Sequence, residues 1–410
     1  MEEQNTRKTA YTVLIAGILF NLTIQVLYIW SLLKIEMMST TPGGWGWSSR
    51  EAGLPYTFII IFFSIGVLIG GRIQDKKGPK WVAAGGGAMV GLGLIISGLV
   101  GNNPIGVAVS FGIISGLGIG FGYGSVLPAC LKWFHPGKKG LIGGLVLGGF
   151  GLATIHYAFI SSSLLSYFDI QTTLILIGIF VMTIAITAAQ FIKNPPPDYI
   201  PAASEKTKKS TSIIKPEIDF KWNEMLKTKR FYIMFTLFLF SASIGLMIIG
   251  NQANIAYIQA GITNAVFLMS LVAIMNALGR ILGGSLSDKI GRENTLFIVI
   301  LLQMINMTGF IFYTNTGLIT FGFAVTGLCF GTFLAVFPAL TADQYGLKNY
   351  GVNYGIVYLA YGLAGIVAPM IADFIYDIRK DFFITYIICA ALMAVMIIIN
   401  LILKYENSRV

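Results

Sequence analysis

The chain has 410 residues, of which 55% are hydrophobic and only 11% are charged. Soluble globular proteins carry roughly 25% charged residues, so this chain lacks the charge that a water-facing surface needs. About a dozen apolar runs of ~20 residues occur, each long enough to cross the hydrocarbon core of a bilayer. These features exclude soluble enzymes, nucleic-acid-binding proteins and secreted disulfide-rich domains. They predict an integral membrane protein.

The apolar runs, taken in chain order, predict an all-α protein with twelve transmembrane helices. The first run is too long for the apolar region of a cleaved signal peptide. The predicted spans are residues 10–33, 53–73, 81–100, 104–129, 140–166, 170–192, 231–255, 262–285, 294–314, 317–341, 350–373 and 381–404. A polar stretch rich in proline and lysine separates the sixth span from the seventh, as expected of a linker. We therefore expect a six-helix bundle at 1–192, a linker at 193–230 and a second six-helix bundle at 231–410.

The distribution of basic residues indicates the orientation. If the N-terminus lies inside, 23 of the 28 lysines and arginines fall in cytoplasmic segments and only four in external ones. Short cytoplasmic loops accumulate lysine and arginine. We therefore expect both termini in the cytoplasm and a location in the plasma or inner membrane, and the net charge of +10 reflects these loops rather than a nucleic-acid partner.

A short motif occurs twice, in the loop after the second span and in the loop after the eighth. The two copies are related by a constant offset of 213 residues and contain Gly71, Asp75 and Gly78 in the first and Gly284, Asp288 and Gly291 in the second. The first glycine allows two helices to approach closely, and the aspartate can cap or pair with a neighbouring helix end. The second glycine suits a tight turn into the next helix. The repeat predicts two equivalent halves.

One charged residue lies in the interior of a predicted span, away from its ends. Arg280 is in the eighth span, about 12 Å from Asp288 at 1.5 Å per residue, and Asn276 is one turn earlier on the same face. An arginine in a membrane costs at least ~2.5–3.5 kcal/mol, so it normally faces a cavity or a partner. Snorkelling to the interface is the alternative. Because all 18 acidic residues lie in loops or at helix ends, a small organic anion is the expected counter-charge, and a carboxylate matches the guanidinium fork.

The repeated loop resembles the signature of the major facilitator superfamily, which implies two six-helix bundles around a central cavity that opens alternately to each side. In that family the loop motif sets the conformational equilibrium and does not bind substrate. Within the superfamily, Tyr123-Gly124, Gly148–Leu152, Phe337-Pro338-Ala339, Asn353-Tyr354-Gly355 and Asn276–Arg280 are similar to the oxalate/formate antiporter family, a relative of the monocarboxylate transporters. The resemblance implies that Arg280 pairs with the substrate carboxylate. It also implies that the site is walled by the aromatic residues Tyr28, Tyr123, Phe150, Phe330 and Tyr358.

The chain departs from the oxalate exchanger at Tyr361. In the exchanger a lysine in the eleventh helix is the second cation for the dianion, and the alignment through Asn353-Tyr354-Gly355 puts Tyr361 there. With one cation, a dianion would keep one poorly compensated carboxylate in a low dielectric. A monocarboxylate such as lactate, pyruvate or formate fits better, and an oxalate/formate-type exchanger is the alternative.

Energy coupling has one candidate histidine within the spans, His156. The unperturbed pKa of a histidine side chain is near 6.5, so proton-linked transport with His156 as carrier is one hypothesis. A hydrogen-bonded packing role for His156, and anion exchange without protons, are the alternatives.

A membrane enzyme would need a cluster of carboxylates, histidines or cysteines, whereas Cys130, Cys329 and Cys389 lie apart without ligand spacing. We therefore expect a monomeric transporter with no cofactor and no metal.

Overall fold

The structure is a computed structural model that describes residues 2–41, 43–196, 199, 201, 219–262 and 266–408. All regular elements in this part of the chain are helices, and eleven of them are long and apolar enough to cross a membrane. The elements of the first half are α1 (Glu2–Ile24), η1 (Val26–Ile29), α2 (Trp30–Met38), α3 (Ser49–Lys77), α4 (Pro79–Val100), α5 (Pro104–Val107), η2 (Ala108–Ser115), α6 (Gly116–Leu131), η3 (Pro136–Lys138), α7 (Lys139–Leu165) and α8 (Ile170–Ala189). Those of the second half are α9 (Trp222–Met225), α10 (Lys229–Gly250), α11 (Gln252–Ala260), α12 (Val266–Ile290), α13 (Arg292–Phe310), α14 (Thr316–Tyr345), α15 (Tyr350–Arg379) and α16 (Phe383–Ser408).

The predicted first span is broken rather than continuous. The prediction of one helix over 10–33 is wrong, because α1 ends at Ile24 and Gln25 leaves helical geometry (φ −82°, ψ 65°) before η1 and α2. The outer piece has an anchor of its own. The Trp30 indole donates a hydrogen bond to the Ala52 carbonyl (2.8 Å) and stacks on Phe111 at 4.8 Å. This tertiary packing overrides the local preference for one long helix.

Two other spans differ from their predictions in detail. The fourth contains the π-helix η2 between α5 and α6, where Ser110 bonds to Ser97 and Ser115 to the Val90 carbonyl of α4. The seventh ends at Gly250, and the chain bends at Asn251 (φ −108°, ψ 9°) into the separate helix α11. The remaining predicted spans are each a single helix that ends within a few residues of its predicted boundary or extends past it.

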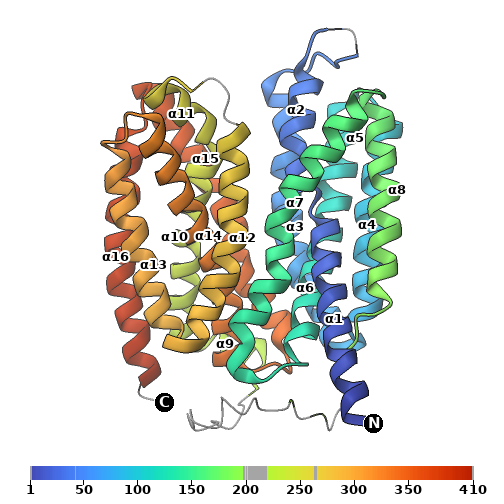
Figure 1. Cartoon of the computed structure of the whole chain (residues 1–410), viewed down its shortest axis with the longest axis vertical. Coiled ribbons are helices and arrows are strands. Elements are labelled where there is room, and N and C mark those ends of the chain that lie inside the picture. Colours follow the sequence, from blue (N-terminus) through green and yellow to red (C-terminus); the bar gives the residue numbers. More distant parts are fainter. Residues whose placement is uncertain are drawn as a thin grey trace. The chain divides into compact units, whose positions relative to one another are not determined.

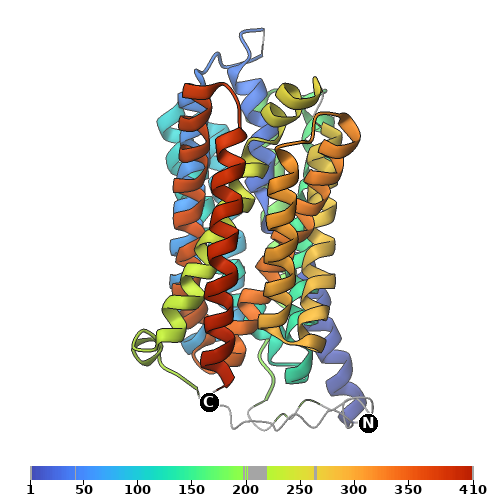
Figure 2. The same ribbon diagram turned by 90° about the vertical axis from the view of Figure 1, so that its left-hand side faces the viewer.

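The helices form two compact units, and two of the helices change unit along their length. Unit 1 comprises Met1–Pro136, Leu152–Asp219 and Gly346–Leu359, and unit 2 comprises Gly137–Gly151, Phe220–Tyr345 and Ala360–Val410. The first halves of α7 and α15 therefore pack with the unit opposite to the one that their sequence position suggests. Within each unit the long helices run side by side (Figures 1 and 2). The division of the chain at the linker stays a prediction.

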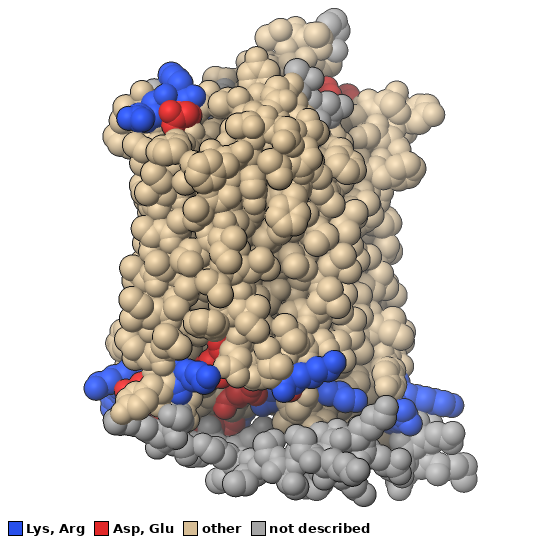
Figure 3. All heavy atoms as spheres, turned by 60° about the vertical axis from the view of Figure 1, so that its left-hand side comes forward, with Lys and Arg blue, Asp and Glu red and all other residues tan. Residues whose placement is uncertain are grey.

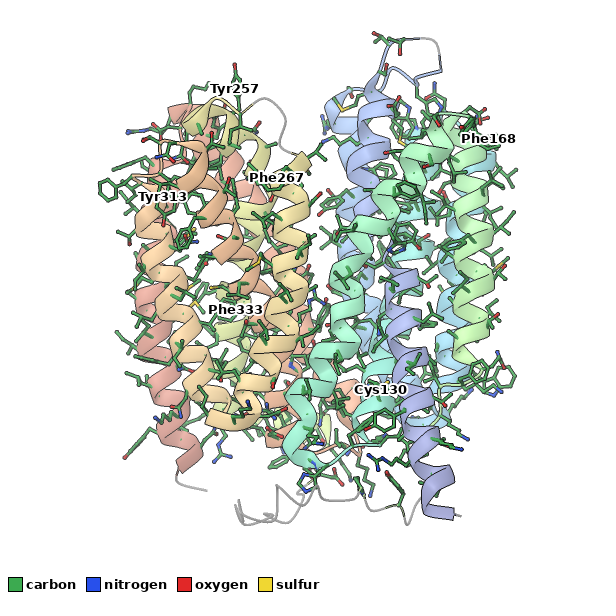
Figure 4. The ribbon with its side chains drawn as sticks, in the orientation of Figure 1. Cys130, Phe168, Tyr257, Phe267, Tyr313 and Phe333 are labelled. Atoms are coloured by element: carbon green, nitrogen blue, oxygen red, sulfur yellow. The ribbon has the colours of Figure 1, made fainter. Side chains whose placement is uncertain are left out.

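Charged side chains on the surface lie near the ends of the long helices on the face drawn in Figure 3. Lysines, arginines and acidic residues gather there, and the broad band between them is uncharged. The three cysteines are buried and free, and Cys130 on α6, labelled in Figure 4, lies among the helices of unit 1. The uncharged band between the helix ends is the surface expected of a protein that contacts hydrocarbon.

Candidate functional site

The first copy of the loop motif holds the start of α15. The Asp75 carboxylate accepts hydrogen bonds from the backbone amides of Gly351 (3.1 Å) and Val352 (2.9 Å). A side chain on Gly71 would overlap the Gly351 carbonyl, so this close approach requires glycine. Gly78 has φ +82° where the chain turns into α4. We call this arrangement the first clamp. Its aspartate accepts hydrogen bonds from backbone amides at a helix start that have no partner within the helix.

The second copy holds the start of α7 in the same way. The Asp288 carboxylate accepts from the amides of Gly140 (2.8 Å) and Leu141 (2.7 Å), and a side chain on Gly284 would overlap the Gly140 carbonyl. Gly291 has φ +92° at the turn into α13. We call this the second clamp. Each aspartate therefore accepts hydrogen bonds from the start of a helix that is distant in sequence.

The two clamps differ in charge. In the second, Arg292 donates to Asp288 (2.6 Å) and to Asp343 (2.8 Å), and Lys139 lies 3.3 Å from Asp343. The position equivalent to Arg292 in the first copy is Pro79, which carries no charge. The spacing of Asp288 and Arg292, four residues apart, is a sequence signal for their pair, but the sequence gives no signal for Asp343, which lies 51 residues after Arg292 on α14.

Lys132, which follows α6, is a cation with an electrostatic effect on Asp75. Burial lowers the pKa of the Lys132 ammonium, and the carboxylates of Asp75 and Asp219 act in the opposite direction. In the described part of the chain, however, no ion pair within 4 Å joins Lys132 to Asp75. The first clamp is therefore held mainly by backbone hydrogen bonds.

Arg280 lies in the middle of a group of neutral partners in unit 2. Its side chain is only 2% exposed. Nε donates to the Asn276 side-chain oxygen (3.0 Å), Nη1 donates to the Leu147 carbonyl on α7 (2.8 Å), and the Phe150 ring centroid is 5.7 Å from Cζ. Among the described residues no carboxylate pairs with Arg280. The guanidinium bonds toward the start of α12, away from Asp288, which disfavours the snorkelling alternative.

The first half of α7 carries a glycine face that allows this contact. Gly140, Gly144, Gly148 and Gly151 recur at helical spacing and pack on α12. A side chain on Gly144 would overlap the carbonyl of Arg280 itself. The close spacing brings the α7 backbone within hydrogen-bonding reach of a side chain on α12. The glycine spacing is a sequence signal for helix packing, but it does not say that a carbonyl would bind the arginine.

The remaining predicted residues separate into different surroundings. In unit 2, Phe330 packs directly on Gly245 of α10, and the ring of Tyr361 lies 6.4 Å from Phe238. His156 in unit 1 is half-buried and its ring centroid is 4.1 Å from that of Tyr157. The side chain of Tyr28 lies outside the described residues.

Tyr123 and Tyr358 meet in an aromatic cluster within unit 1. Their ring centroids are 5.0 Å apart, and each contacts Phe63, at 5.5 and 5.3 Å respectively. Tyr354 completes the cluster through its hydroxyl, 3.4 Å from that of Tyr123. The sequence gives no signal for Phe63, because Phe63, Tyr123 and Tyr358 lie on three separate helices that only the fold brings together.

Comparison with known proteins decides the family. The family model described as Major Facilitator Superfamily matches residues 12–326 and 246–409. The chain belongs to the Major Facilitator Superfamily. As a member it is a multi-pass membrane transporter of small molecules and not an enzyme. The predicted fold class is likewise confirmed by the helical architecture and by this match.

Several curated members of the superfamily are similar over most of the chain. They include the uncharacterized MFS-type transporter YhjX of Escherichia coli (26% identity, 86% of each chain), the oxalate:formate antiporter of Oxalobacter formigenes (28%, 69% of this chain and 66% of the relative) and the apicoplast pyruvate carrier 1 of Toxoplasma gondii (22%, 76% and 65%). The predicted resemblance to the oxalate/formate antiporter is thereby confirmed.

Solved structures of superfamily members have the same fold. A single-substitution variant of the E. coli fucose:proton symporter FucP aligns with a TM-score of 0.71 at 13% identity over 96% of this chain and 98% of that one. The human organic anion transporter MFSD10 aligns with a TM-score of 0.70 at 14% identity over 96% and 99%. At these identities the likeness concerns the fold alone.

Proposed function

We propose that this Major Facilitator Superfamily protein transports small monocarboxylate anions by alternating access, with Arg280 as the anion anchor. The observation that carries the proposal is the buried guanidinium, whose partners among the described residues are all neutral. A buried cation without a fixed counter-charge favours an anionic ligand, because pairing offsets the cost of removing the charge from water.

The hydrogen-bonding capacity of Arg280 supports a single carboxylate. A guanidinium has five N–H donors, and Asn276 and Leu147 accept from one each, which leaves three. A planar carboxylate takes two parallel hydrogen bonds from such a fork. A dianion would need a second cation, whereas Tyr361 stands where the oxalate exchanger has a lysine. The names of two relatives, an oxalate:formate antiporter and a pyruvate carrier, are consistent with a small carboxylate.

The other binding residues belong to the same proposal. Asn276 would hold the Arg280 fork, and Phe150 would face its cation. The further aromatic contacts that we propose for the substrate during its passage are Tyr28, Tyr123, Phe330, Tyr358 and Tyr361. The two clamps would act on the conformational cycle through Asp75 and Asp288 and would not touch substrate.

Energy coupling and location complete the proposal. We favour proton-linked movement with His156 as the candidate carrier, and oxalate/formate-type exchange is the alternative. We place the protein in the plasma or inner membrane as a monomer with both termini in the cytoplasm, and the counts of basic residues support this orientation. Substrate-driven acidification of liposomes that hold a pH dye and no internal anion supports proton linkage. Uptake that requires a preloaded counter-anion supports the exchanger.

The test of substrate class is counterflow into proteoliposomes. Labelled formate, lactate, pyruvate and oxalate are each offered to vesicles that contain the same unlabelled anion. We expect at least one monocarboxylate to accumulate faster than oxalate. Accumulation of oxalate alone would replace the proposal by the dianion exchanger, and accumulation of none would reject a carboxylate substrate.

A further inference from the structure

The Leu147 carbonyl makes the backbone of α7 part of the Arg280 site. Leu147 lies three residues after Gly144, on the segment of α7 that packs in unit 2, and its oxygen is 2.8 Å from Nη1. A carbonyl oxygen carries partial negative charge, so it stabilises the buried guanidinium when no anion is bound. The helix then leaves this surrounding almost at once, since α7 belongs to unit 1 from Leu152 onward.

Gly144 allows the carbonyl to reach the arginine. A Cβ at this position would overlap the Arg280 carbonyl and lie 3.1 Å from the Cα of Ile281, both of them backbone atoms that cannot move aside cheaply. One turn later the helices are less crowded. A Cβ on Gly148 would lie 3.4 Å from the Ile281 side chain, which is ordinary van der Waals contact. The two glycines thus share a helix face but differ in what an added methyl group would do.

We propose that a bound carboxylate competes with the Leu147 carbonyl for Arg280, so that substrate binding loosens α7 from α12. The inference rests on the proposed function, because it needs an anion at Arg280. A carboxylate can bind to the free N–H groups of Nη1 and Nη2, and its charged oxygen then lies beside the Leu147 oxygen on the same nitrogen and repels that oxygen. A carboxylate offers the guanidinium a full negative charge, whereas the carbonyl offers only a partial one, so the substrate prevails. Gly144 is accordingly a positioning residue for the site.

The competition has a consequence for transport. An empty carrier must break the bond between Arg280 and Leu147 unaided before α7 can move, whereas a loaded carrier has already exchanged that bond for the substrate. Exchange of anions should therefore be faster than net efflux in the wild-type protein. By linkage, a change that weakens the α7 contact must also strengthen carboxylate binding, by at most the same factor.

The test compares Gly144→Ala with Gly148→Ala in proteoliposomes. Formate, lactate and pyruvate, each alone, are used to measure the ratio of exchange to net efflux and the dissociation constant of the purified protein. For Gly144→Ala we expect the ratio to fall about tenfold, the factor for one charge-assisted hydrogen bond, and the anion to bind severalfold more tightly. Gly148→Ala should stay within about twofold of wild type on both measures. Structural damage alone would not tighten binding.

The outcomes separate this inference from the proposed function. Wild-type protein that binds none of the three anions refutes the proposed function. If the wild type binds an anion but Gly144→Ala and Gly148→Ala have equal exchange-to-efflux ratios and equal anion affinities, this inference is overturned and the proposed function stands. If the Gly144→Ala protein does not accumulate in the membrane, the inference is tested on the wild type by hydrogen exchange of the backbone amides of residues 139–151. Faster exchange with saturating anion supports the competition, and unchanged or slower exchange overturns it.

Discussion

The two clamps have the same backbone geometry in different electrical surroundings. Asp75 and Asp288 each accept two amide hydrogen bonds from the first turn of a helix, at distances of 2.7–3.1 Å. Only Asp288 is also bound by an arginine, Arg292, which continues the ion network to Asp343. Both copies of the repeat therefore have the same close glycine contact and the same aspartate–amide hydrogen bonds, and the second copy also has ion pairs.

The same asymmetry extends to the candidate site. Unit 2 holds the buried cation Arg280 with its neutral acceptors, whereas the predicted site residues Tyr123 and Tyr358 of unit 1 form an aromatic cluster. Electrostatic discrimination of an anion should accordingly reside in unit 2. Substitutions in the two units should then have effects of very different size.

The largest expected effect comes from Arg280→Lys. Lysine keeps the charge but cannot offer a planar fork to a carboxylate, so the variant should lose most transport, by at least about tenfold for one or two lost charge-assisted hydrogen bonds. Counterflow at matched membrane abundance measures the loss. The control is Arg72→Lys, an exposed arginine in the first copy of the loop motif, which should transport normally. Normal uptake by Arg280→Lys would show that Arg280 is not the anion anchor.

A comparable loss should follow when a charge is introduced beside the anchor. Asn276→Asp is nearly isosteric, but it would put a carboxylate at 3.0 Å from Nε and supply the counter-charge that we assign to substrate. Uptake should fall about tenfold or more at neutral pH. Asn276→Leu, which removes the hydrogen bond without adding charge, should be impaired less. Equal uptake in the two variants would show that charge balance does not govern this site.

Removal of the two clamp charges should have intermediate and unequal effects. Asp288→Asn leaves the buried Arg292 with one anionic partner fewer and should cost about 1.5–3 kcal/mol of stability. Asp75→Asn leaves no ion-paired arginine behind and weakens the hydrogen bonds from two backbone amides and the Gln74 side chain, for about 1 kcal/mol. Thermal unfolding of the purified variants measures the difference. A larger cost at Asp75 would contradict the assigned asymmetry.

The clamp variants also separate conformational from binding roles. Asp75→Asn should slow transport while stabilisation by added monocarboxylate stays close to that of the wild type, because Asp75 contacts the start of α15 and not the anchor. Loss of equilibrium substrate binding in this variant would place the first clamp in the site.

The smallest effect is expected in the aromatic cluster. The hydroxyls of Tyr123 and Tyr354 are 3.4 Å apart, which is long for a hydrogen bond between oxygens. Tyr123→Phe keeps the ring contacts and should change stability by no more than about 1 kcal/mol. Uptake by Tyr123→Phe and by Arg280→Lys, measured side by side, compares the contributions of the two units to transport. A loss as large as that of Arg280→Lys would give unit 1 an equal part in anion binding.

Sequence patterns predicted most of the fold, because hydropathy reports directly on the bilayer. They failed at Gln25, where α1 breaks because Trp30 is held separately by Ala52 and Phe111. The pairing of Asn276 with Arg280 was predictable from helical spacing alone. The Leu147 carbonyl was not, since any residue has a carbonyl and only packing between residues 133 positions apart brings this one to the arginine.

The central claim is that Arg280, a buried cation whose partners among the described residues are all neutral, binds one carboxylate. Its most direct test is equilibrium binding of labelled formate, lactate, pyruvate and oxalate to the purified wild-type and Arg280→Lys proteins, each shown to be folded by thermal unfolding. We predict that at least one monocarboxylate binds the wild type more tightly than oxalate and that Arg280→Lys loses this binding by about tenfold or more. Tighter binding of oxalate, or monocarboxylate binding that survives in Arg280→Lys, would contradict the account.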